Sequence, residues 1–125
     1  MATIGATLAS VRPGEVVIDL PFRGDLTQQH GFLHAGVVTA VVDSACGYAA
    51  LTLMPPGAAV LTVEFKVNLL APARGAGFRA QGRVERAGRT LTVCTGELRA
   101  ADSDAVIALM QATMMAVEGR DDRRD

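Results

Sequence analysis

The chain has 125 residues, half of them apolar, and its 12 Lys and Arg against 13 Asp and Glu give a formal net charge of −1. This length suits one domain with its own core, whereas the near-neutral charge and the few aromatic residues argue against a nucleic-acid-binding surface. Two cysteines are too few for a disulfide scaffold, so composition alone leaves a small globular domain without assigned chemistry.

Two short strands are predicted at the start of the chain. Residues Thr3–Val11 and Glu15–Phe22 have the composition of strands and flank the turn dipeptide Pro13-Gly14. The segment 1–14 lacks the basic region and long apolar region of a secretory signal, so we expect a cytoplasmic protein. The segment 23–31, which follows, is polar and irregular.

The longest apolar segment, Phe32–Met54, has the length of a membrane span but carries Asp43 near its centre. A central Asp costs about 2.5 to 3.5 kcal/mol on insertion scales, so we expect no contact with a membrane. The pattern predicts instead a helix from His34 to about Leu53, ended by Pro55-Pro56-Gly57. Because this helix is apolar on all sides, it must be buried on nearly all sides.

Four strands are predicted after the helix. Val60–Leu70 alternates with period two, which predicts a buried face made of Leu61, Val63, Phe65, Val67 and Leu69. A hairpin across Ala87-Gly88 and a last strand follow, although the Leu, Met and Ala content of that last segment also suits a helix. These further strands are expected at 77–85, 89–99 and 105–117.

The order of two strands, one helix and four strands predicts the α+β class with an antiparallel sheet. A helix of this length measures about 30 Å, and a strongly curved sheet wrapped around it would bury most of its surface. One sheet seldom covers a whole helix, so we expect a second subunit to cover the rest. The domain is expected to span 1–117, followed by a charged, frayed tail over 118–125.

Candidate chemistry lies at the start of the helix and inside it. Backbone N–H groups at a helix N-terminus suit an oxyanion, and the small residues Ala35 and Gly36 would let a carbonyl approach them. Asp43 is a candidate base or nucleophile, the alternative being a structural carboxylate bound by a neighbouring hydroxyl or backbone group. His34 and Asp43 are about 13–14 Å apart along the axis, so a site that uses both ends would be shared across a dimer.

The motif His34-Ala35-Gly36 followed by Asp43-Ser44-Ala45 resembles the HGG…D signature of hotdog-fold thioesterases of the PaaI-like, phenylacetate-pathway type. The resemblance includes Gly31 upstream and Leu70-Ala71-Pro72-Ala73, and it covers most of the chain, from about Gly5 to Val117. It implies a long central helix wrapped by a curved antiparallel β-sheet, hydrolysis of acyl-CoA thioesters without metal or organic cofactor, and a homodimer or a dimer-of-dimers tetramer.

The resemblance also implies roles for individual residues. Asp43 is the base or nucleophile, and the N–H of Ala35, beside Gly36, polarises the thioester carbonyl from the opposite subunit. Thr62 helps to position the attacking water, and Gln28 stands where Asn is usual. The chain departs from the signature twice, with Gln at 28 and Ala at 35, but Ala35 keeps its N–H and Gln29 could replace Gln28.

Positive charge concentrates in the second half, where Lys66–Arg99 has seven basic residues against two acidic ones. Arg side chains match phosphates bidentately, and a CoA thioester carries several phosphates. The turn residues Arg74, Arg86, Gly88 and Arg89 are therefore candidate CoA contacts, with His34 and Gly31 as further substrate-binding candidates. The alternative is a solvated strand face that reflects the Arg-rich composition.

Two other functions are compatible with the sequence. A hotdog hydratase or dehydratase would need a His base, for which His30 and His34 are available, and a non-catalytic acyl-CoA binding module would keep the pocket without turnover.

His30 and His34 are four positions apart, but Gly31 argues against a helix there and no third ligand is near, so no metal is expected. Cys46 and Cys94 lie in apolar segments and are expected to be inert core residues.

Overall fold

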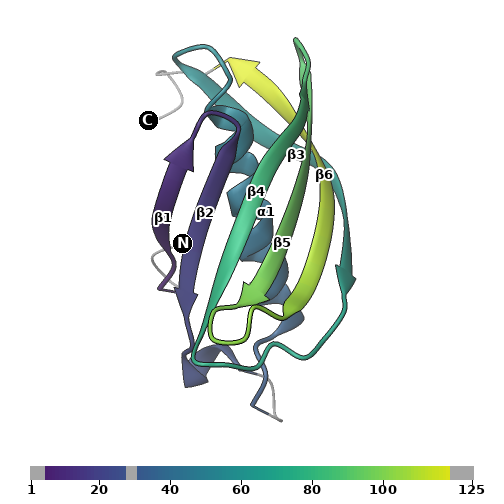
Figure 1. Ribbon diagram of the computed structural model, residues 1–125. Coiled ribbons are helices and arrows are strands. Elements are labelled where there is room, and N and C mark those ends of the chain that lie inside the picture. The colour runs from purple at the N-terminus through teal and green to yellow at the C-terminus, as the bar shows by residue number, and fades with distance from the viewer. Residues whose placement is uncertain (1–4, 28–30, 119–125) are drawn as a thin grey trace.

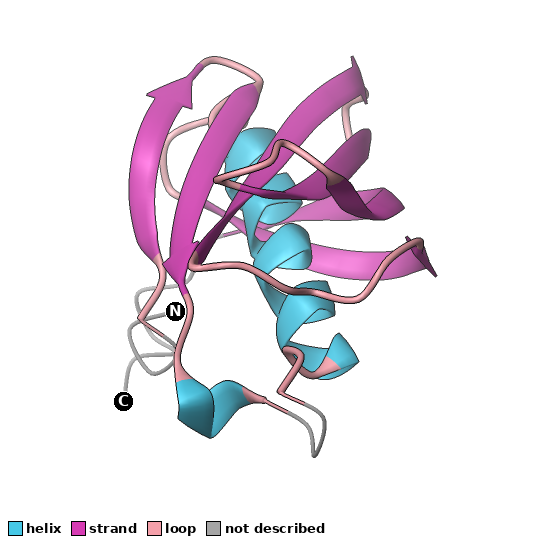
Figure 2. Cartoon of the chain, turned by 60° about the horizontal axis from the view of Figure 1, so that its bottom comes forward, coloured by secondary structure: helices cyan, strands magenta, loops and turns pink. Residues whose placement is uncertain are grey.

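A six-stranded antiparallel sheet curls around one α-helix in the computed structural model, which describes residues 5–27 and 31–118 (Figures 1 and 2). The strand order is β1-β2-β4-β5-β6-β3, so β1 and β3 are the edges. This arrangement confirms the predicted α+β class and the hotdog architecture. The elements are β1 (Thr7–Arg12), β2 (Glu15–Pro21), a 3₁₀ turn (Gly24–Leu26), α1 (Ala35–Leu51), β3 (Ala58–Leu69), β4 (Gly77–Ala87), β5 (Leu91–Ala100) and β6 (Val106–Glu118).

The sequence predictions located these elements to within a few residues. The helix is shorter than predicted at both ends, because His34 is its N-cap and Thr52 its C-cap. The last element is a strand, not a helix, and the hairpin turn comprises residues 88–90, where Gly88 N–H donates to Leu91 O at 2.8 Å. Among the described residues no helix is both long and apolar enough to cross a membrane.

The helix lies close to the middle of the sheet because two cross-strand neighbours, Gly82 and Gly96, have no side chain. A Cβ at position 82 would lie 2.3 Å from the backbone C and O of Ala45, and one at position 96 would lie 2.7 Å from Cys46 Sγ. Glycine is therefore required sterically at both positions. This close approach fixes the depth at which α1, and with it the carboxylate two residues before Ala45, sits against the sheet.

The sheet of one chain does not cover the whole helix. The stripe that faces away from the sheet stays exposed at Ala35, Gly36, Ala40 and Tyr48. Tyr48, the largest of these side chains, is 41% exposed. One sheet therefore leaves part of an apolar helix uncovered, as its geometry suggested.

The predicted buried face of β3 is wrong at Leu61 and Val63, whereas Val67 is half-buried and packs against the core. The register shifts between Thr62 and Glu64, so Val63 is a β-bulge and the alternation changes face there. Thr62 lies opposite the buried Met114 and faces the helix, whereas Leu61 and Val63 are 52% and 51% exposed. Phe65 and Leu69, beyond the bulge, are also about half exposed, at 46% and 51%, because β3 is the edge strand and borders the covered part of the sheet.

Candidate active site

A carboxylate and a hydroxyl meet between the helix and the edge strand. Asp43, in the middle of α1, is half-buried, and its Oδ1 accepts a hydrogen bond of 2.9 Å from the hydroxyl of Thr62 on β3. Thr62 Oγ1 also lies 3.2 Å from Sδ of Met114, which is fully buried on β6. The bulge at Val63 turns Thr62 toward the helix, so local backbone irregularity builds this pair. The structure thus brings together Asp43 and Thr62.

The N-terminus of α1 offers free backbone donors. His34 is the N-cap, with φ −59° and ψ 140°, and makes no side-chain capping hydrogen bond. The first intrahelical bonds come from Val37 and Val38 N–H to His34 O, at 3.0 and 3.1 Å. The amides of Ala35 and Gly36 precede this ladder, so they are free to bind an oxyanion. Both residues are exposed.

Two backbone hydrogen bonds hold the segment that leads into the helix. Leu33 N–H donates to Ala73 O at 3.2 Å, and His34 N–H donates to Leu26 O at 3.1 Å. Leu33 and Ala73 are both buried. The start of α1 is therefore fixed between the 3₁₀ turn and the β3–β4 connection, which pre-orients its free amides.

An apolar hollow of about 520 Å³ opens beside these amides. The guanidinium carbon of the exposed Arg74 lies 5.0 Å from the centre of the ring of Phe32, which lines the hollow. The size is in the range of small-molecule pockets, and the lining suits a hydrocarbon group. The lining residues are Phe32, Leu33, Ala35, Val38, Leu69, Leu70, Ala71, Pro72, Ala73 and Ile107.

Ala35 and Asp43 are eight positions apart on one helix, or about 12 Å along its axis. Asp43 does not line the hollow beside Ala35. One chain therefore does not bring both groups to a single thioester, whose carbonyl oxygen must lie about 3 Å from the N–H and whose carbonyl carbon must be reached by a water bound to the carboxylate.

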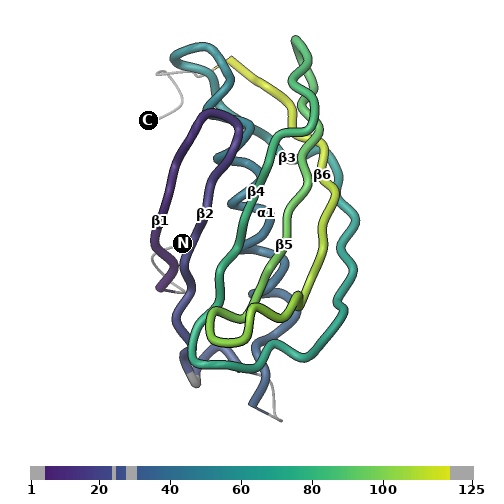
Figure 3. Tube along the Cα trace, in the orientation of Figure 1, coloured from purple at the N-terminus to yellow at the C-terminus, as the bar shows by residue number. Residues whose placement is uncertain are grey.

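The candidate phosphate ligands divide into two places. Arg74 lies on the β3–β4 connection, at the end of the sheet where α1 begins, whereas Arg86, Gly88 and Arg89 lie at the β4–β5 turn at the opposite end (Figure 3). Arg89 lines a second hollow of about 390 Å³ with residues 55–58 and the end of β6. All three Arg side chains are exposed. The four predicted turn residues therefore do not form one cluster within a chain.

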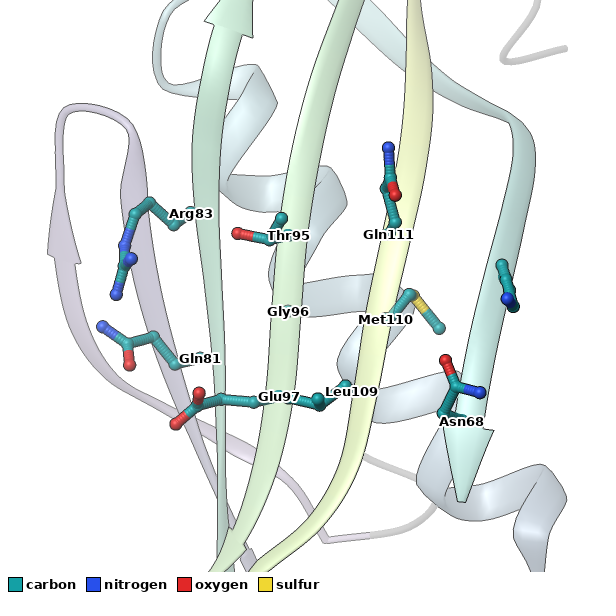
Figure 4. A pocket seen from close by; sticks show the side chains of 10 residues that line it. Asn68, Gln81, Arg83, Thr95, Gly96, Glu97, Leu109, Met110 and Gln111 are labelled. Carbon is teal, nitrogen blue, oxygen red and sulfur yellow. The ribbon is translucent and has the colours of Figure 1, made fainter. Parts of the chain in front are cut away.

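A third hollow, of about 340 Å³, lies on the face of the sheet away from the helix (Figure 4). Three of its polar side chains are bonded to neighbours: Gln81 and Arg83 to Glu15, and Glu97 to Arg99. Asp43 is not part of this lining. We therefore place the candidate active site on the helix side.

The two thiols are not candidate nucleophiles. Burial, the largest effect, together with the neighbouring Cys94 and Asp43, raises the pKa of Cys46 to about 12. Burial and then Glu85 raise the pKa of Cys94 to about 11. Both thiols are fully buried and remain protonated near neutral pH. This agrees with the expectation of inert core cysteines.

Some predicted residues lie outside the described part of the chain, namely Gln28, Gln29 and His30. Gly31 is described, with φ +84°, a conformation that favours glycine. No cluster of three metal-ligating side chains occurs within residues 5–27 and 31–118. Sequence reasoning missed Met114, because its contact with Thr62 depends on strand register across 52 positions.

Comparison with known proteins identifies the family. The family model described as "Thioesterase superfamily" matches residues 30–107, which include the start of α1, Asp43 and Thr62. The chain belongs to this superfamily. A thioesterase family protein of Silicibacter pomeroyi, known from a crystal structure, is 54% identical, with a TM-score of 0.91 and coverage of 95% of this chain and 89% of that chain. Membership confirms the resemblance predicted from the His34-Ala35-Gly36 motif and supports thioester hydrolysis.

Curated relatives agree but are longer. A protein of Saccharolobus solfataricus named as an esterase is 33% identical over 74% of this chain and 66% of its own length. The 1,4-dihydroxy-2-naphthoyl-CoA hydrolase of Listeria monocytogenes is 32% identical over 55% of this chain and 56% of its own length. The chain thus spans about two thirds or less of these relatives. The PaaI protein of Escherichia coli shares the fold, with a TM-score of 0.86 at 19% identity and coverage of 94% of this chain and 83% of that chain.

Proposed function

We propose that this protein is an acyl-CoA thioesterase that hydrolyses an acyl-CoA to the free acid and CoA. The observation that carries the proposal is Asp43, a half-buried carboxylate in a thioesterase-superfamily helix, held by the Thr62 hydroxyl at 2.9 Å. The Listeria relative is named for hydrolysis of a CoA thioester, which supports CoA as the leaving group.

In the proposed reaction Asp43 takes a proton from a water, and the resulting hydroxide adds to the thioester carbonyl. The N–H of Ala35, beside Gly36, donates to the oxyanion, and collapse of the adduct breaks the C–S bond. The proton on Asp43 then passes to the departing CoA sulfur. A carboxylate bound by Thr62 through Oδ1 can offer its other oxygen to water, as the base route requires. Gln28 is proposed to orient the same water.

We propose a homodimer in which each site takes Asp43 from one subunit and Ala35 from the other. The separation of about 12 Å between these residues within one helix supports this arrangement. The edge strand β3 has unpaired backbone groups on one side and exposes Leu61, Val63 and Phe65, so a second copy could extend the sheet there. The exposed stripe of α1 would lie next to the same junction.

The apolar hollow beside Ala35 is proposed to receive the acyl group. Its lining is apolar, and its position beside the free amides would place a carbonyl attached to that group against Ala35 N–H. The proposed partners of the CoA phosphates are Arg86 and Arg89, at the turn with Gly88, and Arg74, beside Phe32 of the hollow. His34 and Gly31 are proposed to lie next to the substrate. Cytoplasmic location is proposed with CoA as substrate.

Continuous measurement of thiol release from a panel of acyl-CoA thioesters tests the proposal. We expect release by the wild type and a loss of at least about 10²-fold in Asp43→Asn, the scale of a positioned acid–base group. A single turnover in H₂¹⁸O should place ¹⁸O in the free acid and none in Asp43. Binding of acyl-CoA without thiol release would contradict the proposed thioesterase activity. Full activity of Asp43→Asn would contradict the proposed role of Asp43 as the base.

A further inference from the structure

The aromatic ring of Phe32 contacts the apolar hollow and an arginine at the same time. Phe32 is half-buried, and among the described residues that line the hollow it alone is aromatic. Its ring centre lies 5.0 Å from the guanidinium carbon of Arg74, which is exposed and does not itself line the hollow. A cation over a ring face is attracted by the quadrupole of the ring. The contact therefore joins a charged surface residue to the wall of the proposed acyl site.

The backbone places these two side chains next to each other. Leu33 N–H donates to Ala73 O at 3.2 Å, and both of these residues are buried. Phe32 comes directly before Leu33, and Arg74 comes directly after Ala73. The hydrogen bond that fixes the start of α1 thus also holds Phe32 and Arg74 together.

The position of the Phe32 ring decides how much of the hollow is open to a substrate. Phe32 has the largest side chain of the described lining, whose other members are aliphatic and include the small residues Ala35, Ala71, Pro72 and Ala73. The residue before it, Gly31, offers no side chain against which the ring could pack. An exposed cation–π contact favours the conformation that makes it by about two- to fivefold, so Arg74 biases the ring toward this position.

We propose that Arg74 is a positioning residue that holds the Phe32 ring in the wall of the hollow, and that this ring limits the length of the acyl group. The inference rests on the proposed function, in which the hollow receives that group. Stacking uses the face of a guanidinium and leaves its N–H edge free, so Arg74 can bind a CoA phosphate from the same position. The pair adds no covalent step to the reaction and acts only on which thioesters enter the site.

Removal of the ring tests the limit on acyl length. The substrates are straight-chain acyl thioesters of N-acetylcysteamine, which lack phosphates. Each methylene that enters an apolar site raises kcat/KM about fourfold, so in wild type kcat/KM should rise with chain length until the chain reaches the ring and fall beyond it. In Phe32→Ala the best chain should be longer by about two methylenes or more, since a Phe side chain equals about two to four CH₂ groups in apolar transfer free energy.

The matched control is Phe22→Ala, which removes an exposed phenyl ring that does not line the hollow and should keep the chain length preferred by wild type. If Phe32→Ala does not fold, Phe32→Leu, which keeps an apolar side chain, should show a smaller shift in the same direction. A preferred chain length that stays the same when the ring is removed would overturn the inference.

Replacement of Arg74 separates positioning from phosphate binding. In Arg74→Gln the preference for the best phosphate-free chain over one two methylenes longer should weaken about two- to fivefold, the scale of an exposed cation–π contact. Arg83→Gln, which removes an exposed positive charge on the face of the sheet away from the helix (Figure 4), should leave this ratio unchanged. An effect of Arg74→Gln that is confined to CoA thioesters and equal at every chain length would overturn the positioning role.

A double-mutant cycle tests whether Arg74 acts through the ring. In a Phe32→Ala background, Arg74→Gln should leave the chain-length profile of the phosphate-free series unmoved, because the ring that it positions is gone. Changes in the two single variants that add in full in the double variant would contradict a joint action of Phe32 and Arg74.

Binding of free carboxylic acids tests the pair without turnover. Straight-chain acids of increasing length are titrated into protein with labelled Leu and Val methyl groups, since Leu33 and Val38 line the hollow. The longest acid that shifts these NMR signals should be longer in Phe32→Ala than in wild type. Equal binding at every length would overturn the inference even in an active thioesterase. Absence of thiol release by wild type would instead overturn the proposed function, while acid binding would still decide whether the ring limits the hollow.

Discussion

The variant Ala35→Pro removes one hydrogen-bond donor from the proposed site and little else. Proline has no N–H, and its φ of about −65° suits the first residue of a helix. Ala35 is that residue, and the first intrahelical bonds come only from Val37 and Val38. The residue before a proline must be extended, as His34 already is at ψ 140°. The substitution therefore breaks no helical hydrogen bond and needs no backbone change.

The expected cost falls on catalysis and not on folding. Removal of one oxyanion donor lowers kcat by about 10² to 10³, whereas Tm should stay within about 3 °C of wild type because no buried contact is lost. The assay is continuous thiol release from the best acyl-CoA of the panel, with kcat and KM determined separately. The buried thiols of Cys46 and Cys94 do not interfere with a thiol-reactive dye.

Ala35→Gly is the matched control, because glycine keeps the N–H and restores the middle residue of the HGG signature. It should retain kcat within about threefold, because the N–H donor is unchanged and glycine adds only some local backbone freedom. If Ala35→Pro folds normally and keeps more than half of the wild-type kcat, the amide of Ala35 is not the oxyanion donor, and the reasoning from the helix N-terminus is wrong.

Three further outcomes follow from packing, burial and charge. Gly82→Ala should lower the free energy of unfolding in urea by about 3 kcal/mol, because a Cβ 2.3 Å from the Ala45 backbone forces the helix outward by about 1 Å. Burial raises the pKa of Cys46 to about 12 and that of Cys94 to about 11, so above about pH 8.5 these thiols ionise in the unfolded chain but not in the folded one. The free energy of unfolding should therefore be unaffected by them below about pH 8.5 and fall above it by about 1.4 kcal/mol per pH unit for each thiol. Arg86→Ala/Arg89→Ala should raise KM for acyl-CoA about tenfold but leave KM for the matching N-acetylcysteamine thioester, which lacks phosphates, unchanged.

Each of these has its own control. Gly47→Ala, whose Cβ would meet only Val60 Cγ1 at 3.9 Å, should gain up to about 1 kcal/mol from helix propensity, and equal losses in both glycine variants would contradict the close-approach argument. Replacement of both cysteines by Ala should remove the alkaline slope, so a slope that persists would come from other groups. A KM increase for both thioesters would contradict phosphate binding by the two Arg.

Local patterns carried enough information to predict the architecture. The apolar segment around Asp43 and the ending at Pro55-Pro56 located the helix, and the run of four strands after it predicted the antiparallel sheet. Long-range geometry was out of reach. The β-bulge at Val63 exchanges the two faces of β3 in the middle of a regular alternation, and no composition signal marks it.

In the candidate site, too, some residues could be predicted from the sequence and others depend on the fold. Asp43 stands out in the sequence because a carboxylate in an apolar segment needs an explanation, and the small residues at the helix start indicated the free amides. Arg74 and Arg86 are both turn residues and so looked alike, yet the 11 residues of β4 place them at opposite ends of the sheet. No sequence pattern marks Met114, since only the pairing of β3 with β6 brings its sulfur to Thr62.

We propose that each active site joins Asp43 of one subunit to Ala35 of another, and a mixing experiment distinguishes this arrangement from a site within one chain. Asp43→Asn and Ala35→Pro, each nearly inactive alone, are unfolded together, refolded as a mixture and assayed for thiol release. Each mixed dimer would contain one intact site, so the mixture should recover about one quarter of the wild-type activity, as twofold symmetry requires. A mixture that forms mixed dimers but stays as inactive as its components would contradict the shared site.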